Sequence, residues 1–268
     1  MSDSQADRGR LRLRSTFDED AELYDRARPG YPSQLFSDLK SLALISGTSH
    51  ILEIGPGTGQ FTRFLSESGA AVTAIDLGPG MVRVARRNLA ACSNVNLIHS
   101  SFEDFPLPPQ PFDVVVSATA FHWIDPTVRL PKSRQALRTG GHLAVIASRH
   151  MAGGTVLFWQ RVERCYEAWF GAGVQEPPNR VQHAVSEILE ELQRFDRFAS
   201  PRLGRYEWEV EYTSETYLDL LRTYSELRTL PAESRERLLE CVRRLIDEEF
   251  RGRIRKRHLT ELVVAEAA

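Results

Sequence analysis

The segment with the clearest capacity for chemistry is an acid followed by three glycines at alternate positions. It reads Glu53-Ile-Gly55-Pro-Gly57-Thr-Gly59. A glycine turn lets the backbone approach a ligand closely, because glycine has no Cβ. The spacing differs from the GxGxxG of dinucleotide sites, since neither position 60 nor position 62, where the third glycine would fall, is a glycine. A carboxylate beside such a turn repels a pyrophosphate and attracts a cation. The segment therefore predicts a site for a positively charged ligand.

A second acid, Asp76, follows at the end of the next short apolar run, residues 71–76. An acid at the end of the second strand of a nucleotide-binding unit accepts hydrogen bonds from a ribose diol. A carboxylate makes such bonds strongly because it is charged. The alternative is that Asp76 only caps a surface helix. With the glycine turn, Asp76 favours a nucleoside as part of the ligand.

The elements that must position these residues alternate between residues 32 and 150. Strands are predicted at 50–54, 71–76, 94–100, 112–117 and 142–148, and helices at 32–44, 60–68, 80–91 and 129–137. Strands separated by helices of about ten residues predict βαβ units in a parallel sheet with right-handed connections. We therefore expect an α/β protein with a doubly wound, Rossmann-like architecture.

The pattern changes after residue 150. Helices are predicted at 155–170 and 185–195, followed by an alternating strand at 205–213. Two apolar stripes between 217 and 250 predict a helical pair, and the chain ends with a strand at 253–264. We expect these last two strands to form an antiparallel edge pair of the same seven-stranded, mostly parallel sheet. The helices between them would form a lid.

A third segment completes a recognisable pattern. Residues 112–123 read Phe-Asp-Val-Val-Val-Ser-Ala-Thr-Ala-Phe-His-Trp. With Glu53, the glycine turn and Asp76, this segment resembles the class I S-adenosylmethionine-dependent methyltransferases. The branch it resembles is the small-molecule one, of methyltransferase type 11, which includes ubiquinone-biosynthesis and trans-aconitate-type enzymes. The resemblance is strong from about 17 to 147 and looser beyond.

The resemblance implies a division of the chain and an activity. Residues 1–15 would be a flexible tail, 16–150 an S-adenosylmethionine-binding core with an N-terminal cap, and 151–268 lid insertions with the last two strands. The reaction would be transfer of a methyl group by in-line displacement to a small-molecule acceptor, leaving S-adenosylhomocysteine and needing no metal. The atom methylated and the acceptor are not predicted.

The resemblance also implies roles for single residues around the cofactor. Glu53 would act near the methionyl end and the three glycines would line the cofactor. Asp76 would bind the ribose, with Leu77 and Met81 beside the adenine. Ser101 stands where many relatives have an aspartate that bonds the adenine, and the backbone N–H of Phe102 would reach an adenine ring nitrogen. Ala118 would border the cofactor.

A second set of residues would lie near the methyl group. The segment 17–32 resembles the family's N-terminal cap, which implies that Tyr24 and Arg28 close over the carboxylate and sulfonium. Tyr31 and Trp123 would lie on the substrate side, and His122 is the candidate catalytic base. Packing roles for Tyr24, Trp123 and His122 remain open at this point.

Composition limits the alternatives. The chain has 34 basic and 36 acidic residues, a net charge of −2, which provides no strong attraction to nucleic acid or anionic membranes. The basic stretch at 251–257 could touch RNA, although charge on an edge strand also guards against aggregation. Nucleic acid is therefore not the expected partner. The oligomeric state is not predicted.

The three cysteines, Cys92, Cys165 and Cys241, are far apart in the sequence and form no CxxC pair. Their odd number argues against a disulfide framework and fits a reducing compartment, so the cytoplasm is the expected location. No apolar run is long enough to span a membrane, and the N-terminus lacks the apolar stretch of a signal peptide.

Two other function classes stay open. One is a non-catalytic protein that binds S-adenosylmethionine or a partner on the same fold, because fold does not imply function. The other is an NAD-dependent oxidoreductase, which would bind a nicotinamide nucleotide and ignore S-adenosylmethionine. An ATPase of the P-loop type is disfavoured because no GxxxxGK[ST] is present.

Overall fold

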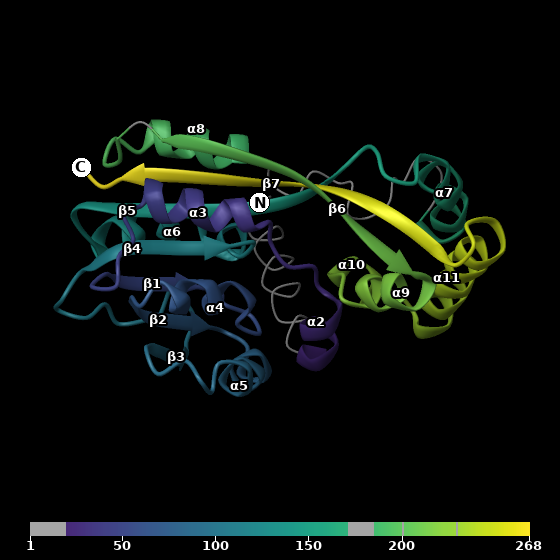
Figure 1. The fold of residues 1–268 in the computed structure, drawn as a ribbon, viewed down its shortest axis with the longest axis horizontal. Helices are drawn as coiled ribbons and strands as arrows, with labels where there is room; N and C mark the ends of the chain where they lie inside the picture. The colour runs from purple at the N-terminus through teal and green to yellow at the C-terminus, as the bar shows by residue number, and fades with distance from the viewer. Residues whose placement is uncertain (1–19, 171–184, 200, 229) are drawn as a thin grey trace, which may run out of the picture. The chain divides into compact units, whose positions relative to one another are not determined.

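A computed structural model describes residues 20–170, 185–199, 201–228 and 230–268 of the chain (Figure 1). The predicted tail at 1–15 lies outside these residues. The chain divides into two compact units. We call residues 30–148, 183–206 and 260–268 the sheet unit, and residues 1–29, 149–182 and 207–259 the helical unit.

The sheet has seven strands in the order β3-β2-β1-β4-β5-β7-β6. In chain order they are β1 His50–Ile54, β2 Ala71–Asp76, β3 Val95–His99, β4 Phe112–Ala118, β5 Leu137–Met151, β6 Arg202–Thr213 and β7 Arg253–Glu266. The first five pair in parallel, with Glu53 opposite Ala74 on one side and Val116 on the other. Strand β7 runs against β5 and β6 (Figure 1). The predicted fold class is confirmed.

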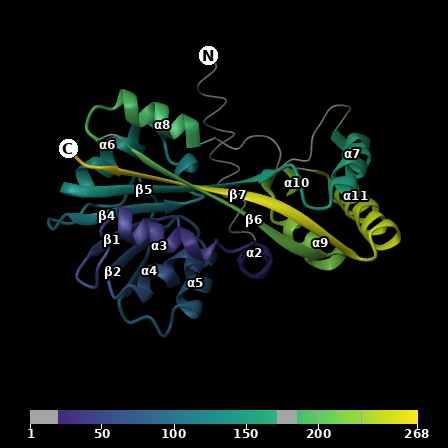
Figure 2. The same ribbon diagram turned by 45° about the horizontal axis from the view of Figure 1, so that its top comes forward.

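Helices cover both faces of the sheet because the buried strands are apolar on both sides (Figures 1 and 2). In β4, Val115 packs into one apolar cluster with Leu130 and Ile188, while Val114 and Val116 pack into another. This alternation follows the two-residue period of a strand. The helices of the sheet unit are α3 Ser33–Leu42, α4 Gln60–Glu67, α5 Pro79–Asn88, α6 Pro126–Ala136 and α8 Val185–Arg194.

Several predicted boundaries differ from the structure, and those of α6 and β5 have clear physical reasons. Helix α6 begins at Pro126 rather than at 129, since the side chain of Asp125 accepts a hydrogen bond from the backbone N–H of Thr127 and so caps the helix. Strand β5 extends from Leu137 to Met151 rather than over 142–148. The strand has two glycines near its start and polar residues near its end, so only its apolar middle is predicted as a strand.

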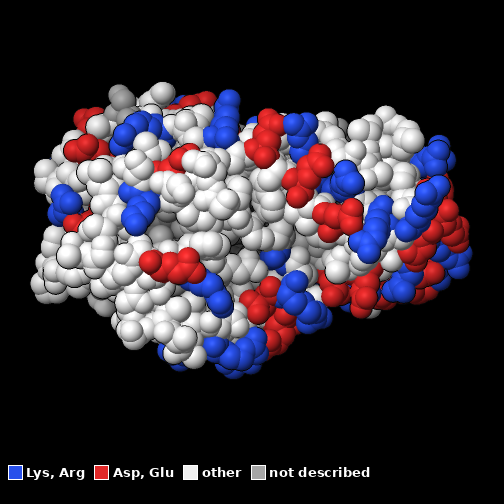
Figure 3. Space-filling model, viewed as in Figure 1, with Lys and Arg blue, Asp and Glu red and all other residues white. Residues whose placement is uncertain are grey.

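The helical unit is built around an aromatic core. Its helices are α2 Ala21–Ala27, α7 Val156–Phe170, α9 Ser214–Arg222, α10 Ser225–Arg228 and α11 Ala232–Arg244, the last continued by a short π-helical turn, η4, at Leu245–Glu249. The predicted stripes account for most of this core, which includes Tyr217, Leu221, Leu238 and Val242. On the surface of the unit, acidic and basic side chains are intermixed over α11 (Figure 3).

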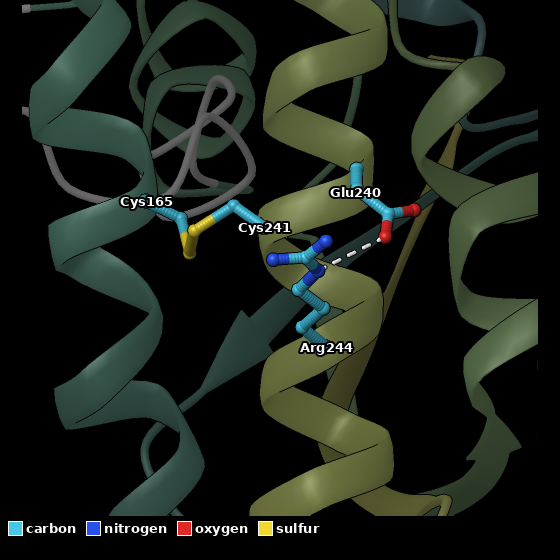
Figure 4. Close-up of a disulfide and its surroundings, with 4 residues drawn as sticks. All are labelled: Cys165, Glu240, Cys241 and Arg244. Atoms are coloured by element: carbon cyan, nitrogen blue, oxygen red, sulfur yellow. Dashed lines mark hydrogen bonds and ion pairs between the residues drawn. A yellow bond between two sulfur atoms is a disulfide. The ribbon is translucent and has the colours of Figure 1, made fainter.

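A disulfide between Cys165 on α7 and Cys241 on α11 contradicts the expectation that the cysteines form none (Figure 4). The two residues are 76 positions apart, yet packing of the two helices brings their Cα atoms within 5.9 Å. Cys92 is the cysteine left free. The odd number of cysteines is therefore explained by one disulfide and one free thiol. It provides no argument for a reducing compartment.

Within the part of the chain that the structure describes, no helix is long and apolar enough to cross a membrane.

Candidate functional site

The glycine turn that follows β1 requires glycine for backbone reasons. Gly55, Gly57 and Gly59 have φ angles of 73°, 57° and 91°, in the left-handed region that side chains rarely adopt. A Cβ on Gly55 would lie 2.4 Å from the Cβ of Ala120, which follows β4. The turn therefore packs directly on the chain at the carboxyl end of β4, and Gly59 begins helix α4 as its N-cap.

Asp76 connects this turn to the end of β2. Its Oδ2 accepts a hydrogen bond of 3.0 Å from the backbone N–H of Gly57, and its Oδ1 accepts one of 2.8 Å from the N–H of Gly78. The helix that follows is capped by Gly78 rather than by Asp76. Asp76 therefore lies between the two loops that leave the carboxyl ends of β1 and β2, where open α/β sheets bind ligands.

Glu53 is buried beneath the turn, with only 1% of its surface exposed. Burial raises the pKa of its carboxyl group to about 8; the nearby hydroxyl of Thr62 acts in the opposite direction, and the charge of Asp76 makes a smaller contribution that also raises the pKa. Glu53 and Thr62 nevertheless do not reach hydrogen-bonding geometry. The carboxyl group is therefore mostly protonated at neutral pH in this structure.

The polar atoms around Glu53 lack partners. Four buried oxygen atoms have no hydrogen-bond partner among the described residues: both carboxyl oxygens of Glu53 and the hydroxyl oxygens of Thr58 and Thr62. A buried polar atom without a partner costs about 1–3 kcal/mol. These four oxygen atoms lie beneath a turn of the kind that binds ligands, and a polar ligand group or a water molecule could pair with them. A cationic ligand group would also favour the charged form of the Glu53 carboxyl.

The residues predicted to surround an adenine lie on the loops after β2 and β3. Leu77 is 39% exposed, and the ring of His99 bonds its carbonyl oxygen at 2.8 Å. Met81 is buried on α5. The hydroxyl of Ser101 donates to Asp104 Oδ2 at 2.6 Å and accepts from its backbone N–H at 3.0 Å. Ser101 therefore stabilises a turn, and only its remaining lone pair is available to a ligand.

Phe102 and Ala118 are both buried. The Phe102 ring belongs to the apolar core and lies 5.5 Å from the Nζ atom of Lys132, so only the backbone of Phe102 suits the predicted contact. Ala118 ends β4, and the neighbouring Ser117 hydroxyl donates to the carbonyl of Ile54 at 2.9 Å. That bond joins the ends of β4 and β1 beside the glycine turn.

The sequence analysis missed Thr119, the residue directly after β4. Its φ of 56° is unusual for a β-branched residue, and such strained backbones cluster at ligand sites. The hydroxyl of Tyr31 lies 3.2 Å from the Thr119 hydroxyl. Tyr31 is thus held at the end of β4, and its place on the substrate side stays a prediction. No local pattern in the sequence signals the backbone of Thr119.

His122 and Trp123 follow one turn later, on the short 3-10 helix η2, Phe121–Trp123. Both side chains are half-buried and their ring centroids are 4.8 Å apart. The backbone N–H of Trp123 donates to the carbonyl of Ala120 at 3.0 Å. The aromatic pair therefore follows the end of β4 by only a few residues. The contacts assign neither His122 nor Trp123 a chemical role.

Tyr24 and Arg28 belong to the helical unit. The guanidinium of Arg28 lies 5.0 Å from the ring of Tyr24 and 4.9 Å from the ring of Tyr224, and its Nη2 donates to the carbonyl of Thr223 at 3.0 Å. The two residues predicted for the cap are therefore in contact with each other. Their predicted contact with a cofactor stays a prediction.

The sheet unit thus brings Glu53, the three glycines, Asp76, Tyr31 and the residues around Thr119 to the carboxyl ends of β1, β2 and β4. In the described part of the chain, no group of three or more His, Cys, Asp or Glu residues is placed to hold a metal ion.

Comparison with known proteins shows which proteins this chain is similar to. Residues 52–145 match the family model described as a methyltransferase domain. An uncharacterized methyltransferase of Mycobacterium tuberculosis (strain ATCC 25618 / H37Rv) is 29% identical over 224 residues, which is 83% of this chain and 82% of the relative. The malonyl-[acyl-carrier protein] O-methyltransferase of Serratia marcescens is 34% identical over 56% of this chain and 58% of its own length.

Solved structures share the fold. A putative type II methyltransferase from Anaeromyxobacter dehalogenans superposes with a TM-score of 0.63 at 23% identity, covering 89% of this chain and 97% of the other. The phosphoethanolamine N-methyltransferase 2 of Haemonchus contortus, in complex with phosphomonomethylethanolamine and S-adenosylhomocysteine, gives 0.55 at 18% identity, covering 93% of this chain and 57% of the other.

Proposed function

We propose that this chain, which carries a methyltransferase domain at residues 52–145, binds S-adenosylmethionine at the glycine turn of its sheet unit and transfers the methyl group to a small-molecule acceptor. The observation that carries the proposal is Glu53: a buried carboxyl group beneath the turn, with both oxygens lacking partners among the described residues. A cationic ligand group would stabilise the charged form of this carboxyl and gain its attraction, whereas a diphosphate would keep the carboxyl protonated and gain no such attraction. The arrangement therefore favours S-adenosylmethionine over a dinucleotide.

The proposed cofactor contacts divide among the loops of the sheet unit. Glu53, with the hydroxyls of Thr58 and Thr62, would serve the methionyl end, directly or through water. The backbone of the glycine turn would line the cofactor. Asp76 already accepts hydrogen bonds from Gly57 and Gly78, but each carboxylate oxygen has a second lone pair for a ribose hydroxyl. Leu77, Met81, Ser101, the backbone of Phe102 and Ala118 would complete the adenine side.

When bound, S-adenosylmethionine supplies an electrophilic methyl group on a sulfonium. The chain's own residues would align the acceptor with that methyl group and keep water away, and positioning of this kind can contribute roughly 7–11 kcal/mol. Tyr31 and Trp123 are the proposed substrate-side residues. His122 would remove a proton only from an acceptor that must lose one, such as a phenol or an ammonium. Tyr24 and Arg28 are proposed to close over the cofactor.

The proposal is tested by calorimetric titration of the full chain with S-adenosylmethionine, S-adenosylhomocysteine and NAD+. We expect the first two to bind and NAD+ not to. At pH 7 the binding of S-adenosylmethionine should release up to about one proton, because a nearby positive charge ionises Glu53. The released protons are counted by repeating the titration in buffers of different ionisation enthalpy.

Glu53→Gln should abolish the proton release and weaken binding, whereas Glu67→Gln, which removes an exposed acid on α4, should change neither. Binding of NAD+ in place of S-adenosylmethionine would overturn the proposal. Incubation with methyl-labelled S-adenosylmethionine and a metabolite extract separates an enzyme from a binding protein, since only an enzyme produces S-adenosylhomocysteine and a labelled product. A cytoplasmic location and the division of the chain at residue 150 stay predictions.

A further inference from the structure

A group of cationic and imidazole side chains is packed inside the helical unit. Lys256 and His258 lie on β7, each with 2% of its surface exposed, and His150 lies on β5. The ring centroids of His150 and His258 are 4.9 Å apart. We call His150, Lys256 and His258 the basic cluster. None of the three belongs to the cofactor contacts proposed above.

Aromatic rings surround the basic cluster. Trp208 stacks on His258 with centroids 4.9 Å apart and an interplanar angle of 27°. The Nζ atom of Lys256 lies 4.6 Å from the ring centroid of Trp159 and 5.3 Å from that of Tyr217. These contacts hold the side chains in place from β6, α7 and α9. They also make the surroundings of the cluster apolar.

The charge around the two histidines has one sign. Burial, reinforced by the charge of Lys256, lowers the pKa of His258 to about 3. Burial and the charges of Lys256, His258 and Arg28 lower the pKa of His150 well below its ordinary value. Both imidazoles are therefore neutral at pH 7. Among the described residues, every charged group that acts on these two pKa values is cationic.

Two buried nitrogens of the cluster have no hydrogen-bond partner among the described residues: Nδ1 of His150 and Nε2 of His258. The other nitrogen of His150, Nε2, lies 3.3 Å from the hydroxyl of Tyr224. If Tyr224 donates to Nε2, the proton of His150 is on Nδ1 and has no acceptor. Buried polar atoms are nearly always paired in folded proteins, so these two nitrogens indicate a missing ligand.

We propose that the basic cluster binds the acidic group of a small organic acid. Anionic oxygens accept hydrogen bonds from the imidazole N–H groups, and Lys256 supplies the compensating charge. The surrounding rings of Trp159, Trp208 and Tyr217 suit a small apolar body. The site stands on the cluster alone and does not depend on the proposed function.

The site is tested by NMR of the full chain labelled with 15N-histidine. Succinate, benzoate and inorganic phosphate are added at constant ionic strength, with succinamide and benzamide as uncharged controls. We expect saturable shifts of the His150 and His258 ring nitrogens with at least one of the two organic acids. The exposed His99, in the sheet unit, should not respond. Equal shifts with the matching amide, shifts with phosphate alone, or no saturable shift would overturn the inference.

Lys256→Met removes the buried charge and keeps most of the apolar stem that contacts Trp159. We expect it to weaken binding of the acid at least tenfold. Arg255→Met is the matched control, because it removes an exposed charge one position away, which pairs with Glu211 at 3.7 Å. The control should remain within twofold. Equal weakening in both variants would indicate a general charge effect and overturn the site.

His258→Phe provides a second variant that preserves stacking on Trp208 and removes both nitrogens. It should weaken binding of the acid at least fivefold with an unchanged circular dichroism spectrum. Unchanged affinity in this folded variant would contradict the proposed hydrogen bond. Its histidine spectrum also assigns the His258 signal by its disappearance.

A final titration separates this inference from the proposed function. If S-adenosylmethionine alone shifts the His150 and His258 signals and succinate or benzoate competes with it, the cluster holds the cofactor's own carboxylate and the inference fails. If S-adenosylmethionine binds elsewhere and no acid binds, the inference fails while the proposed function stands. If an acid binds the cluster and S-adenosylmethionine does not bind at all, the anion site stands and the proposed function fails.

Discussion

The carboxylate of Asp76, at the end of β2, accepts a hydrogen bond from the backbone N–H of Gly57 in the turn after β1. The shape of the glycine turn and the orientation of this carboxylate therefore depend on each other. A residue assigned to a ribose is also a structural support of the turn that would line the rest of the nucleoside. Substitutions at either position should affect both roles.

Asp76→Ala should weaken binding of S-adenosylmethionine by about 1–3 kcal/mol, because charged hydrogen bonds to the ribose are lost and the turn loses its support. Asp76→Asn keeps the size of the side chain and one acceptor oxygen, so its loss should be smaller. Calorimetric titration of both variants measures the difference. Unchanged affinity in Asp76→Ala would contradict the ribose assignment.

Gly55→Ala should destabilise the fold and impair cofactor binding. The new Cβ would lie 2.4 Å from the Cβ of Ala120, and the φ of 73° is unfavourable for alanine. We expect a loss of about 1–3 kcal/mol in the free energy of unfolding. Gly47→Ala is the control, since its Cβ would approach only a carbonyl oxygen at 3.7 Å. Urea denaturation compares the two, and equal effects would contradict the close packing of the turn on Ala120.

Glu53 should make stability depend on pH. Its pKa is about 8 in the folded chain and 4.5 in the reference state. A raised folded pKa means that the protonated form is favoured by folding. This contribution is fully present below about pH 4.5 and is lost as the pH rises through about 8. Relative to Glu53→Gln, the wild type should therefore lose stability over this range, by on the order of 4 kcal/mol.

The measurement is the free energy of unfolding in urea at pH 5, 6, 7 and 8 for the wild type and Glu53→Gln. The difference between the two should grow with pH, at most by about 1.4 kcal/mol per pH unit. Glu67→Gln controls for the loss of an acid at the surface. Parallel pH profiles for the wild type and Glu53→Gln would show that the buried carboxyl does not titrate as described.

Reduction of the disulfide should destabilise the helical unit. The bridge between Cys165 and Cys241 closes a long loop, 76 positions in sequence, and such bridges typically contribute about 2–4 kcal/mol. Adding dithiothreitol should lower the thermal midpoint of the wild type. The double variant Cys165→Ala/Cys241→Ala should have a low midpoint that dithiothreitol does not change, and Cys92→Ser should behave as the wild type. A midpoint of the wild type that is insensitive to reductant would contradict the bridge.

Much of the sheet unit could be predicted because its signals are local. The run 112–117 is apolar at four of its six positions, and the structure packs its apolar residues into the clusters on the two faces of the sheet. The glycines of the turn permit a left-handed backbone, and all three have it. The apolar stripes that include Tyr217 and Leu238 repeat with the helical period and form the core of the helical unit.

Tertiary structure alone decided the features that depend on distant parts of the chain. Helix packing joins Cys165 to Cys241, although their spacing suggested no bridge. Burial by the surrounding chain raises the pKa of Glu53. The close approach of Gly55 to Ala120 occurs next to the left-handed backbone of Thr119. The pairing of His150 with His258 joins residues more than 100 positions apart. Periodicity reports which face of an element is buried, but desolvation and contact are set by what the rest of the chain places against that face.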